Sequence, residues 1–162
     1  MTDFEEALSR SREREKAFAR WLGRWAYVLP VYDFSGHGES KAPKLSGARE
    51  GLVCPDFLVS HDGLTVWVEL KHKRSSWSGL GYPETGMSLR LWDQYRRVQD
   101  ATGISVYVVF AHVAEDKITW DPIHTLESLP SKRIYKGDRF AHMVFWRLEE
   151  LKMIKRYTEV FR

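Results

Sequence analysis

The sequence has very little cysteine and no long apolar run. Its 162 residues include one cysteine, Cys54, which excludes an internal disulfide and a cysteine-based zinc site. No segment stays apolar over the roughly 18–20 residues that a transmembrane helix needs. Residues 1–16 are highly charged where a secretory signal would be hydrophobic. We therefore expect a cytoplasmic protein in which Cys54 is a small buried side chain.

Glycine-rich phosphate-binding loops are also missing. The glycines at positions 36 and 38 follow a predicted strand but open no helix, so neither a Walker loop nor a dinucleotide fingerprint is present. The six histidines are scattered along the chain, and none pairs with a second ligand at the spacing of a zinc site. The sequence therefore gives no support to ATP use or to a zinc site.

What the chain does contain is enough apolar sequence for one core. Hydrophobic residues make up 43% and charged residues 29%, which excludes wholesale disorder, and the length suits one domain spanning residues 1–162. The net charge is only +3, but basic residues cluster in two short stretches, 71–74 and 90–97. Such clusters fit a polyanionic partner, and they are equally typical of a solvated surface.

Hydrophobic periodicity predicts the elements of the first two thirds of the chain. Apolar residues recur at helical spacing over residues 3–24 and again over 88–102, where Ser88 is the expected N-cap and Gly103 the expected stop. β-Branched and aromatic residues predict a strand over 26–34, at a sheet edge because of Pro30. Loops are expected over 35–50 and 75–86, a hairpin over 52–60 and 64–73, and a fully buried strand over 104–113.

The predicted order is therefore α-β-β-β-α-β, an α/β fold with a central mixed sheet flanked by helices. Beyond it, residues 117–120 and 139–146 resemble short strands, and residues 121–129 and 147–157 resemble short amphipathic helices.

The turn of the predicted hairpin places two acids opposite each other. If Asp62-Gly63 is a two-residue turn, paired residue numbers add up to 125, so Asp56 faces Glu69. Alternation puts Lys71 and Trp67 on the same face and leaves the opposite face apolar, as one side of the core. Directly opposed carboxylates repel unless a cation lies between them.

A divalent metal would resolve this repulsion. Magnesium or manganese accepts one or two carboxylates together with water and phosphate oxygens, so Asp56 and Glu69 are candidate ligands and the carbonyl of Leu70 is a further one. Lys71 would then lie near the attacking water and the scissile phosphate, where it could orient the water or stabilise transition-state charge.

These residues carry a resemblance to a known family. Pro55-Asp56, twelve intervening residues and Glu69-Leu70-Lys71 resemble the motif of the PD-(D/E)XK nuclease superfamily, which includes restriction endonucleases, archaeal Holliday-junction resolvases and phage exonucleases. The resemblance covers about residues 3–112 and leaves 113–162 as accessory strands and helices. It implies a restriction-endonuclease-like αβββαβ core and Mg²⁺- or Mn²⁺-dependent hydrolysis of DNA, with junction resolvases or structure-selective phage nucleases as the nearest types.

The resemblance also implies further site residues. Many members carry a glutamate on the first helix that contacts a metal, and Glu15 lies on the apolar stripe of the predicted helix, although it also fits a partly exposed acid. Some members carry Gln-x-x-x-Tyr on the later helix; here Gln94 is followed by Val98 at the tyrosine position, so the match is incomplete. Tyr95 could approach DNA but fits core packing better.

DNA is the implied partner, and a homodimer would present two sites to two strands. The residues predicted to contact nucleic acid are Lys41, Lys44, Arg49, Lys73, Arg74, Arg90, Gln94, Arg96 and Arg97.

Two other interpretations remain open. Asp, Glu and Lys on a ribbon face also form ordinary cross-strand salt bridges. The chain would then be a protein-interaction domain without metal affinity. It could also be a catalytically silent nucleic-acid-binding module of the same fold.

Overall fold

A computed structural model describes residues 3–31, 43–46, 51–137 and 142–161. Its centre is a mixed six-stranded sheet in which only β5 and β7 run parallel. Short local turns connect the antiparallel neighbours β4–β5 and β7–β8, whereas the parallel pair is joined through a helix. In spatial order the strands are β1 (Tyr27–Pro30), β4 (Phe57–His61), β5 (Leu64–Lys73), β7 (Val106–His112), β8 (Lys117–Pro122) and β11 (Met153–Lys155).

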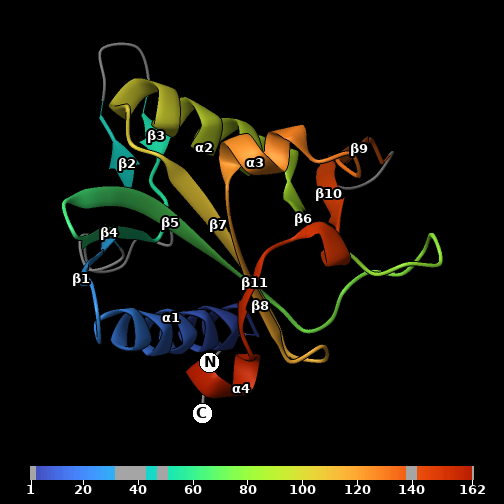
Figure 1. The fold of residues 1–162 in the computed structure, drawn as a ribbon, viewed down its shortest axis with the longest axis horizontal. Coiled ribbons are helices and arrows are strands. Elements are labelled where there is room, and N and C mark those ends of the chain that lie inside the picture. The colour runs from blue at the N-terminus through green and yellow to red at the C-terminus, as the bar shows by residue number, and fades with distance from the viewer. Residues whose placement is uncertain (1–2, 32–42, 47–50, 138–141, 162) are drawn as a thin grey trace.

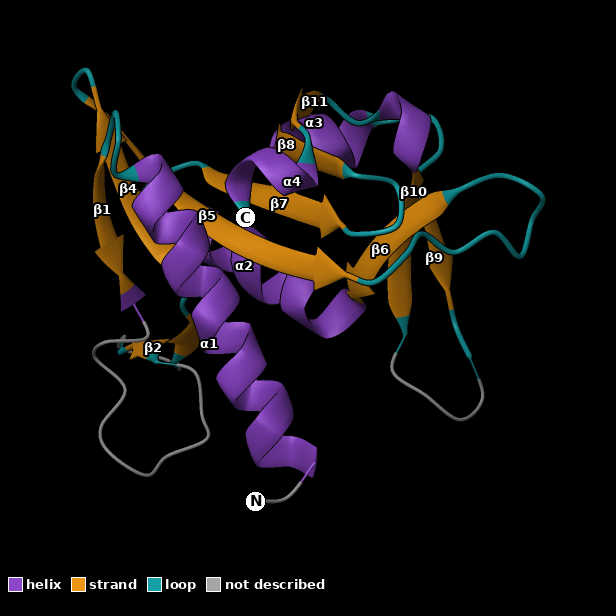
Figure 2. Ribbon diagram, turned by 90° about the horizontal axis from the view of Figure 1, so that it is seen from below, coloured by secondary structure: helices purple, strands orange, loops and turns teal. Residues whose placement is uncertain are grey.

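Helices cover both faces of this sheet (Figure 1). On one face lie α1 (Asp3–Leu22) and α4 (Tyr157–Val160), and α1 lies across β5 (Figure 2). On the other face lie α2 (Leu89–Thr102) and α3 (Ile123–Ser128). Each face has its own hydrophobic core, one around Phe18 and Val68 and the other around Trp92 and Val108. No helix of the described chain is long and apolar enough to cross a membrane.

The central position of β5 corrects one expectation about the hairpin. Val68 and Leu70 pack in the core as predicted, on the side that α1 covers. The opposite face is also buried, because α2 covers it, and Trp67 on that face is only 8% exposed. The acids on that face therefore lie partly inside the protein. The prediction of a strand buried on both faces near 104–113 is confirmed by β7, and Cys54 is buried as expected.

Two small sheets flank the central one. The first has the order β6 (Glu84–Ser88), β10 (Met143–Arg147) and β9 (Arg133–Tyr135), and it lies beyond the C-terminal end of β5 (Figure 2). The second pairs β2 (Lys44–Leu45) with β3 (Leu52–Val53). The predicted loop over 75–86 is wrong at its end, because Glu84–Gly86 pairs with Phe145–Arg147 of β10.

The predicted boundaries of the first strand and of the two long helices are close to the observed ones. The edge strand near 26–34 is β1, with Pro30 on the outermost strand. The first helix ends at Leu22 rather than near residue 24. Gly103 ends α2 in a left-handed conformation (φ 68°) and donates its N–H to the Gln99 carbonyl (2.9 Å). Ser88 occupies the N-cap position, but its hydroxyl makes no capping bond.

The C-terminal part differs most from the predictions. The helix expected over 147–157 is instead a 3-10 turn η2 (Leu148–Glu150), the strand β11 and the short helix α4. Tertiary pairing explains the difference, since β11 pairs with the exposed edge of β8 and Leu151 is buried. Strand 117–120 is confirmed within β8, and strand 139–146 is confirmed by β10 in its described part. The helix expected over 121–129 is the shorter α3, because Asp121 and Pro122 still belong to β8. Most of the predicted loop 35–50 lies outside the described residues.

Candidate active site

A tight turn fixes the register of the β4–β5 hairpin. Asp62 and Gly63 both have positive φ (49° and 78°), as a two-residue hairpin turn requires. Phe57 pairs with Val68 and His61 with Leu64, so paired numbers add up to 125 as predicted. Asp56 immediately precedes β4 and lies beside β5 at the level of Glu69 and Leu70.

A backbone hydrogen bond holds Asp56 in this place. The N–H of Leu70 donates to Oδ2 of Asp56 over 2.8 Å. Burial and the neighbouring Glu69 raise the pKa of Asp56 well above its usual value, against the opposing effect of Lys71. The carboxylate therefore lies where its negative charge is unfavourable unless a cation is nearby.

Glu69 lies at the centre of the site. It is only 3% exposed, and its Oε1 forms an ion pair with the ammonium of Lys71. Its second oxygen, Oε2, is buried and has no hydrogen-bond partner within the described structure. A buried unsatisfied carboxylate oxygen is costly, and such atoms in native proteins commonly mark a missing ion or water.

Lys71 is kept in its charged form. Burial disfavours the ammonium, but Glu69 and Asp56 together outweigh it, so the pKa of Lys71 lies above its ordinary value. Its Nζ lies 6.0 Å from the centre of the Tyr95 ring. The site therefore contains a fixed positive charge beside Asp56 and Glu69.

Tyr95 is a site residue that sequence reasoning treated as packing. It is 2% exposed and belongs to the core, as its place on the helical stripe predicted. Burial and the negative charges of Glu69 and Asp56 also raise the pKa of its hydroxyl well above the usual value, which places it next to the site. One side chain thus serves both roles, and a helical stripe alone reveals only the first.

Glu15 lies at the edge of the same site. Its Oε1 accepts a hydrogen bond from the hydroxyl of Ser11 one turn earlier (3.0 Å). Burial raises the pKa of Glu15; Ser11 opposes this, and Glu69 adds to it. The structure therefore brings α1 close enough for Glu15 to interact electrostatically with Glu69.

Gln94 contacts the chain that leads into Asp56. Its Oε1 accepts the backbone N–H of Val53 over 3.2 Å, so α2 anchors the segment three residues before Asp56. This contact gives Gln94 a positioning role and does not depend on a tyrosine at position 98.

The donor set fits a hard divalent cation. Asp56 and Glu69 supply carboxylate oxygens, one of them without a partner. The Leu70 carbonyl points to the same side of β5 as its N–H, which binds Asp56. The described residues contain no cluster of three or more His, Cys, Asp or Glu side chains arranged to hold a metal. Magnesium does not require one, since it usually keeps several waters and takes one or two carboxylates plus substrate phosphate.

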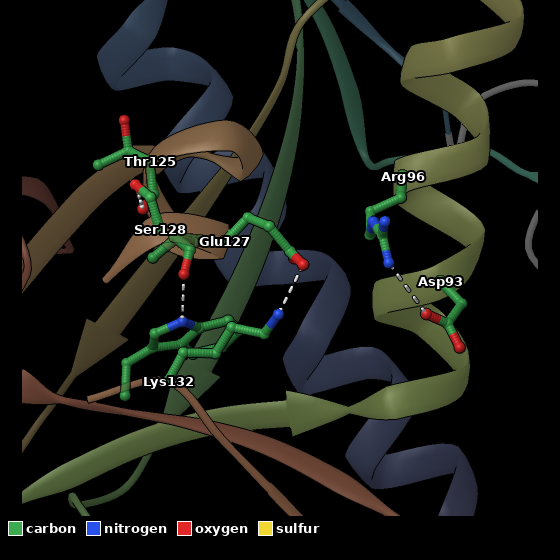
Figure 3. A network of polar contacts seen from close by, with 8 residues as sticks. Asp93, Arg96, Thr125, Glu127, Ser128 and Lys132 are labelled. Carbon is green, nitrogen blue, oxygen red and sulfur yellow. Dashed lines mark hydrogen bonds and ion pairs between the residues drawn. The ribbon is translucent and has the colours of Figure 1, made fainter. Parts of the chain in front are cut away.

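The predicted nucleic-acid contacts are dispersed. Arg90, Arg96 and Arg97 are exposed along α2, and Arg96 lies 3.9 Å from Asp93 of the same helix (Figure 3). A second polar network, in which Lys132 pairs with Glu127 of α3, lies outside the site (Figure 3). Lys44 and Arg74 are exposed and Lys73 is half-buried, whereas Lys41 and Arg49 lie outside the described residues.

Comparison with known proteins identifies the fold. No protein-family model matches the chain, and no curated protein is similar to it. Among solved structures it is similar to Hjc, a Holliday junction resolvase of the archaeal hyperthermophile Archaeoglobus fulgidus, with a TM-score of 0.53 and 14% identity over 85% of this chain and 88% of Hjc. It also aligns with D212, a nuclease from a fusselovirus, with a TM-score of 0.44 and 15% identity over 96% of this chain and 82% of D212.

The likeness to Hjc confirms the predicted fold class. The chain has a restriction-endonuclease-like α/β fold, with a central mixed sheet flanked by helices. At this identity the comparison concerns the fold, so the chemistry has to be argued from the site.

Proposed function

We propose that the chain is a metal-dependent nuclease that hydrolyses DNA phosphodiester bonds, and that it acts as a structure-selective endonuclease of the resolvase or phage type. One observation carries the proposal. Asp56, Glu69 and Lys71 lie together on a partly buried hairpin face. There Glu69 makes the negative charge of Asp56 less favourable, and one oxygen of Glu69 has no hydrogen-bond partner among the described residues. A salt bridge made only for solubility would lie in solvent, whereas the Glu69 side chain is only 3% exposed.

Each residue has a definite task in this proposal. Asp56 and Glu69, with the Leu70 carbonyl, hold Mg²⁺ or Mn²⁺, with Glu15 at the edge of the site. When bound, the ion supplies Lewis acidity and lowers the pKa of water. Lys71 stays protonated, so it orients the nucleophile or stabilises the charge that builds up on the phosphate. Tyr95 closes the site on the side of α2, where it keeps water away from Asp56 and Glu69.

Basic side chains around this face would bind the DNA backbone without reading its sequence. We propose that the exposed residues Lys44, Arg74 and Arg90 share this task. One chain carries one such site, so cutting both strands of a junction or duplex would need a homodimer.

The test is cleavage of labelled linear duplex, single-stranded, flapped and four-way-junction DNA in Mg²⁺, Mn²⁺ or EDTA. We expect cutting only with metal, complete loss in Asp56→Asn, and a loss of about 10²–10³-fold in Lys71→Met. Asp121→Asn is the matched control, because Asp121 is also buried and also accepts a backbone N–H, from Lys152, but on β8. Its activity should equal that of the unmodified chain.

Two outcomes would contradict the proposal. If both Asp56→Asn and Lys71→Met still cut DNA, the reaction takes place at another site. Salt-sensitive DNA binding with no cutting of any substrate would identify the chain as a nucleic-acid-binding module of this fold.

A further inference from the structure

Lys73 continues the catalytic face of β5 beyond Lys71. The β5–β7 pairing runs without interruption from Trp67 to Lys73, which pairs with His112. Because side chains alternate along an unbroken strand, Glu69, Lys71 and Lys73 point to the same side. Lys71 and Lys73 are two residues apart, so their Cα atoms are separated by about 6.6 Å along the strand. The ammonium of Lys73 therefore lies next to the site but does not belong to the Asp56–Glu69–Lys71 group.

No acid of the described residues neutralises Lys73. It is half-buried, and it forms no ion pair with any carboxylate of the described chain. Burial and the like charge of Lys71 lower its pKa. Its strand neighbour His112 is fully buried, bonded to the Thr85 hydroxyl (3.0 Å), and burial lowers its pKa to about 4, so it is neutral. Glu115, on the turn after β7, instead accepts the N–H of Ser76 (2.7 Å).

An unpaired, half-buried ammonium beside another ammonium is unfavourable in the free protein. An anion bound at this point would remove the cost. The other lysine of the face is already paired with Glu69, so the anion has to be one that extends past the catalytic group toward the end of β5. A nucleic-acid strand offers such an anion, because its phosphates follow one another at regular intervals.

We propose that Lys73 binds the phosphate next to the scissile one, so that the site selects phosphodiester bonds that lie inside a strand. This inference rests on the proposed function and deepens it. A substrate without a charged phosphate on the Lys73 side of the scissile bond would lose this contact. The bond nearest a strand end on that side would therefore be cut poorly.

The first experiment measures DNA binding in EDTA, so that it needs no cleavage. Affinity of the Asp56→Asn protein for a labelled four-way junction is measured over a series of NaCl concentrations, with and without Lys73→Met. We expect Lys73→Met to weaken binding by about 10-fold and to reduce the slope of log affinity against log salt by about 0.9, one phosphate contact. Lys73→Arg should keep the slope.

Lys155→Met is the matched control. Lys155 also lies on a strand of the central sheet, but on the far edge strand β11, and it is ion-paired with Glu159 (3.4 Å). Its loss should leave affinity and slope unchanged. If Lys73→Met binds with the same affinity and slope as Lys155→Met, or if no junction binding is measurable, the inference is overturned.

Thermal unfolding separates binding from a structural role. Since Lys73 is unpaired and repelled by Lys71, Lys73→Met should melt at the same or a higher temperature than the parent protein. Weaker binding together with a lower melting temperature would assign Lys73 to structure and overturn the inference.

The second experiment leaves Lys73 unchanged and alters the DNA. Once the cleavage position is mapped, a neutral methylphosphonate replaces the phosphate on either side of it. One of the two replacements should slow cutting by about 10-fold in the wild type and have no further effect in Lys73→Met. No effect of either replacement would refute the contact. If the chain binds through Lys73 in EDTA but never cuts, the proposed function fails, and the selection of internal bonds fails with it; only the contact of Lys73 with a phosphate remains. If the chain cuts but Lys73→Met changes neither binding nor cutting, this inference fails while the proposed function stands.

Discussion

Replacing Asp56 with asparagine should make the metal-free protein more stable. Asparagine has nearly the same shape, and its carbonyl oxygen can still accept the Leu70 N–H that now bonds Oδ2 at 2.8 Å. The substitution removes only the charge, whose cost appears in the raised pKa of Asp56. The hairpin therefore keeps its hydrogen bond and loses a repulsion.

The size of the gain follows from the hairpin geometry. Directly opposed residues of an antiparallel pair have Cβ atoms about 5 Å apart. Two like charges at that separation repel by about 3 kcal/mol at an effective dielectric constant of 20. The attraction of Lys71 for Asp56 offsets part of this. We expect a net gain of about 1.5 kcal/mol, which for a chain of this length raises the melting temperature by about 4 °C.

Thermal and urea unfolding at pH 7.5 in EDTA measure the effect. Asp121→Asn is the control, because Asp121 is buried and accepts the Lys152 N–H, but its charged neighbour is a lysine. Burial also raises the pKa of Asp121, so Asp121→Asn should gain some stability, but less than Asp56→Asn, because its charged neighbour Lys152 is attractive. Mg²⁺ at ten times its dissociation constant should stabilise the wild type by about 1.4 kcal/mol and leave Asp56→Asn unchanged. A lower melting temperature for Asp56→Asn in EDTA would refute the electrostatic account of the site.

Three further predictions concern residues around the site and the small sheet. Gln94→Leu leaves the Val53 N–H without its partner (3.2 Å), so it should cost about 1 kcal/mol in urea unfolding and lower the cleavage rate. Arg133→Met strips Glu84, 1% exposed, of two bonds of 2.8 and 2.6 Å; breaking such a buried pair should cost about 3 kcal/mol. His112 has its pKa lowered to about 4, so the unfolded chain takes up the proton first and stability should fall between about pH 6.5 and 4, by up to about 3 kcal/mol.

Each of these has its own contradicting result. Unchanged unfolding of Gln94→Leu would show that water replaces the amide. An Arg133→Met protein that unfolds like the wild type would show that the ion pair with Glu84 contributes little to stability. An acid dependence that is the same in His112→Asn as in the wild type would assign the loss of stability to other groups, such as His72.

The hairpin of the candidate site could be predicted because its information is local. Asp62-Gly63 sets a two-residue turn, the turn sets the register, and the register brings Asp56 to Glu69. None of these steps depends on the rest of the chain. The burial of the acidic face could not be predicted in the same way, because it is α2, with Trp92 and Tyr95, that covers it.

The C-terminal part resisted prediction for the opposite reason. Residues 147–157 have the composition of an amphipathic helix, but the open edge of β8 offers backbone hydrogen bonds to Met153 and Lys155. β6 likewise emerges from a Gly- and Pro-rich segment because β10 pairs with it. In both cases a partner distant in sequence outweighs local propensity.

The position of β5 also determines how the chain can assemble during synthesis. β5 can pair with β4 as soon as the two-residue turn forms. Its other edge can pair only with β7, which begins at Val106 and is synthesised later. Until that strand leaves the ribosome, the apolar run Leu64–Leu70 presents an unpaired edge, and such edges template aggregation. Fragments that stop before β7 should therefore be insoluble, and the candidate site residues should reach their final surroundings only after the parallel strand docks.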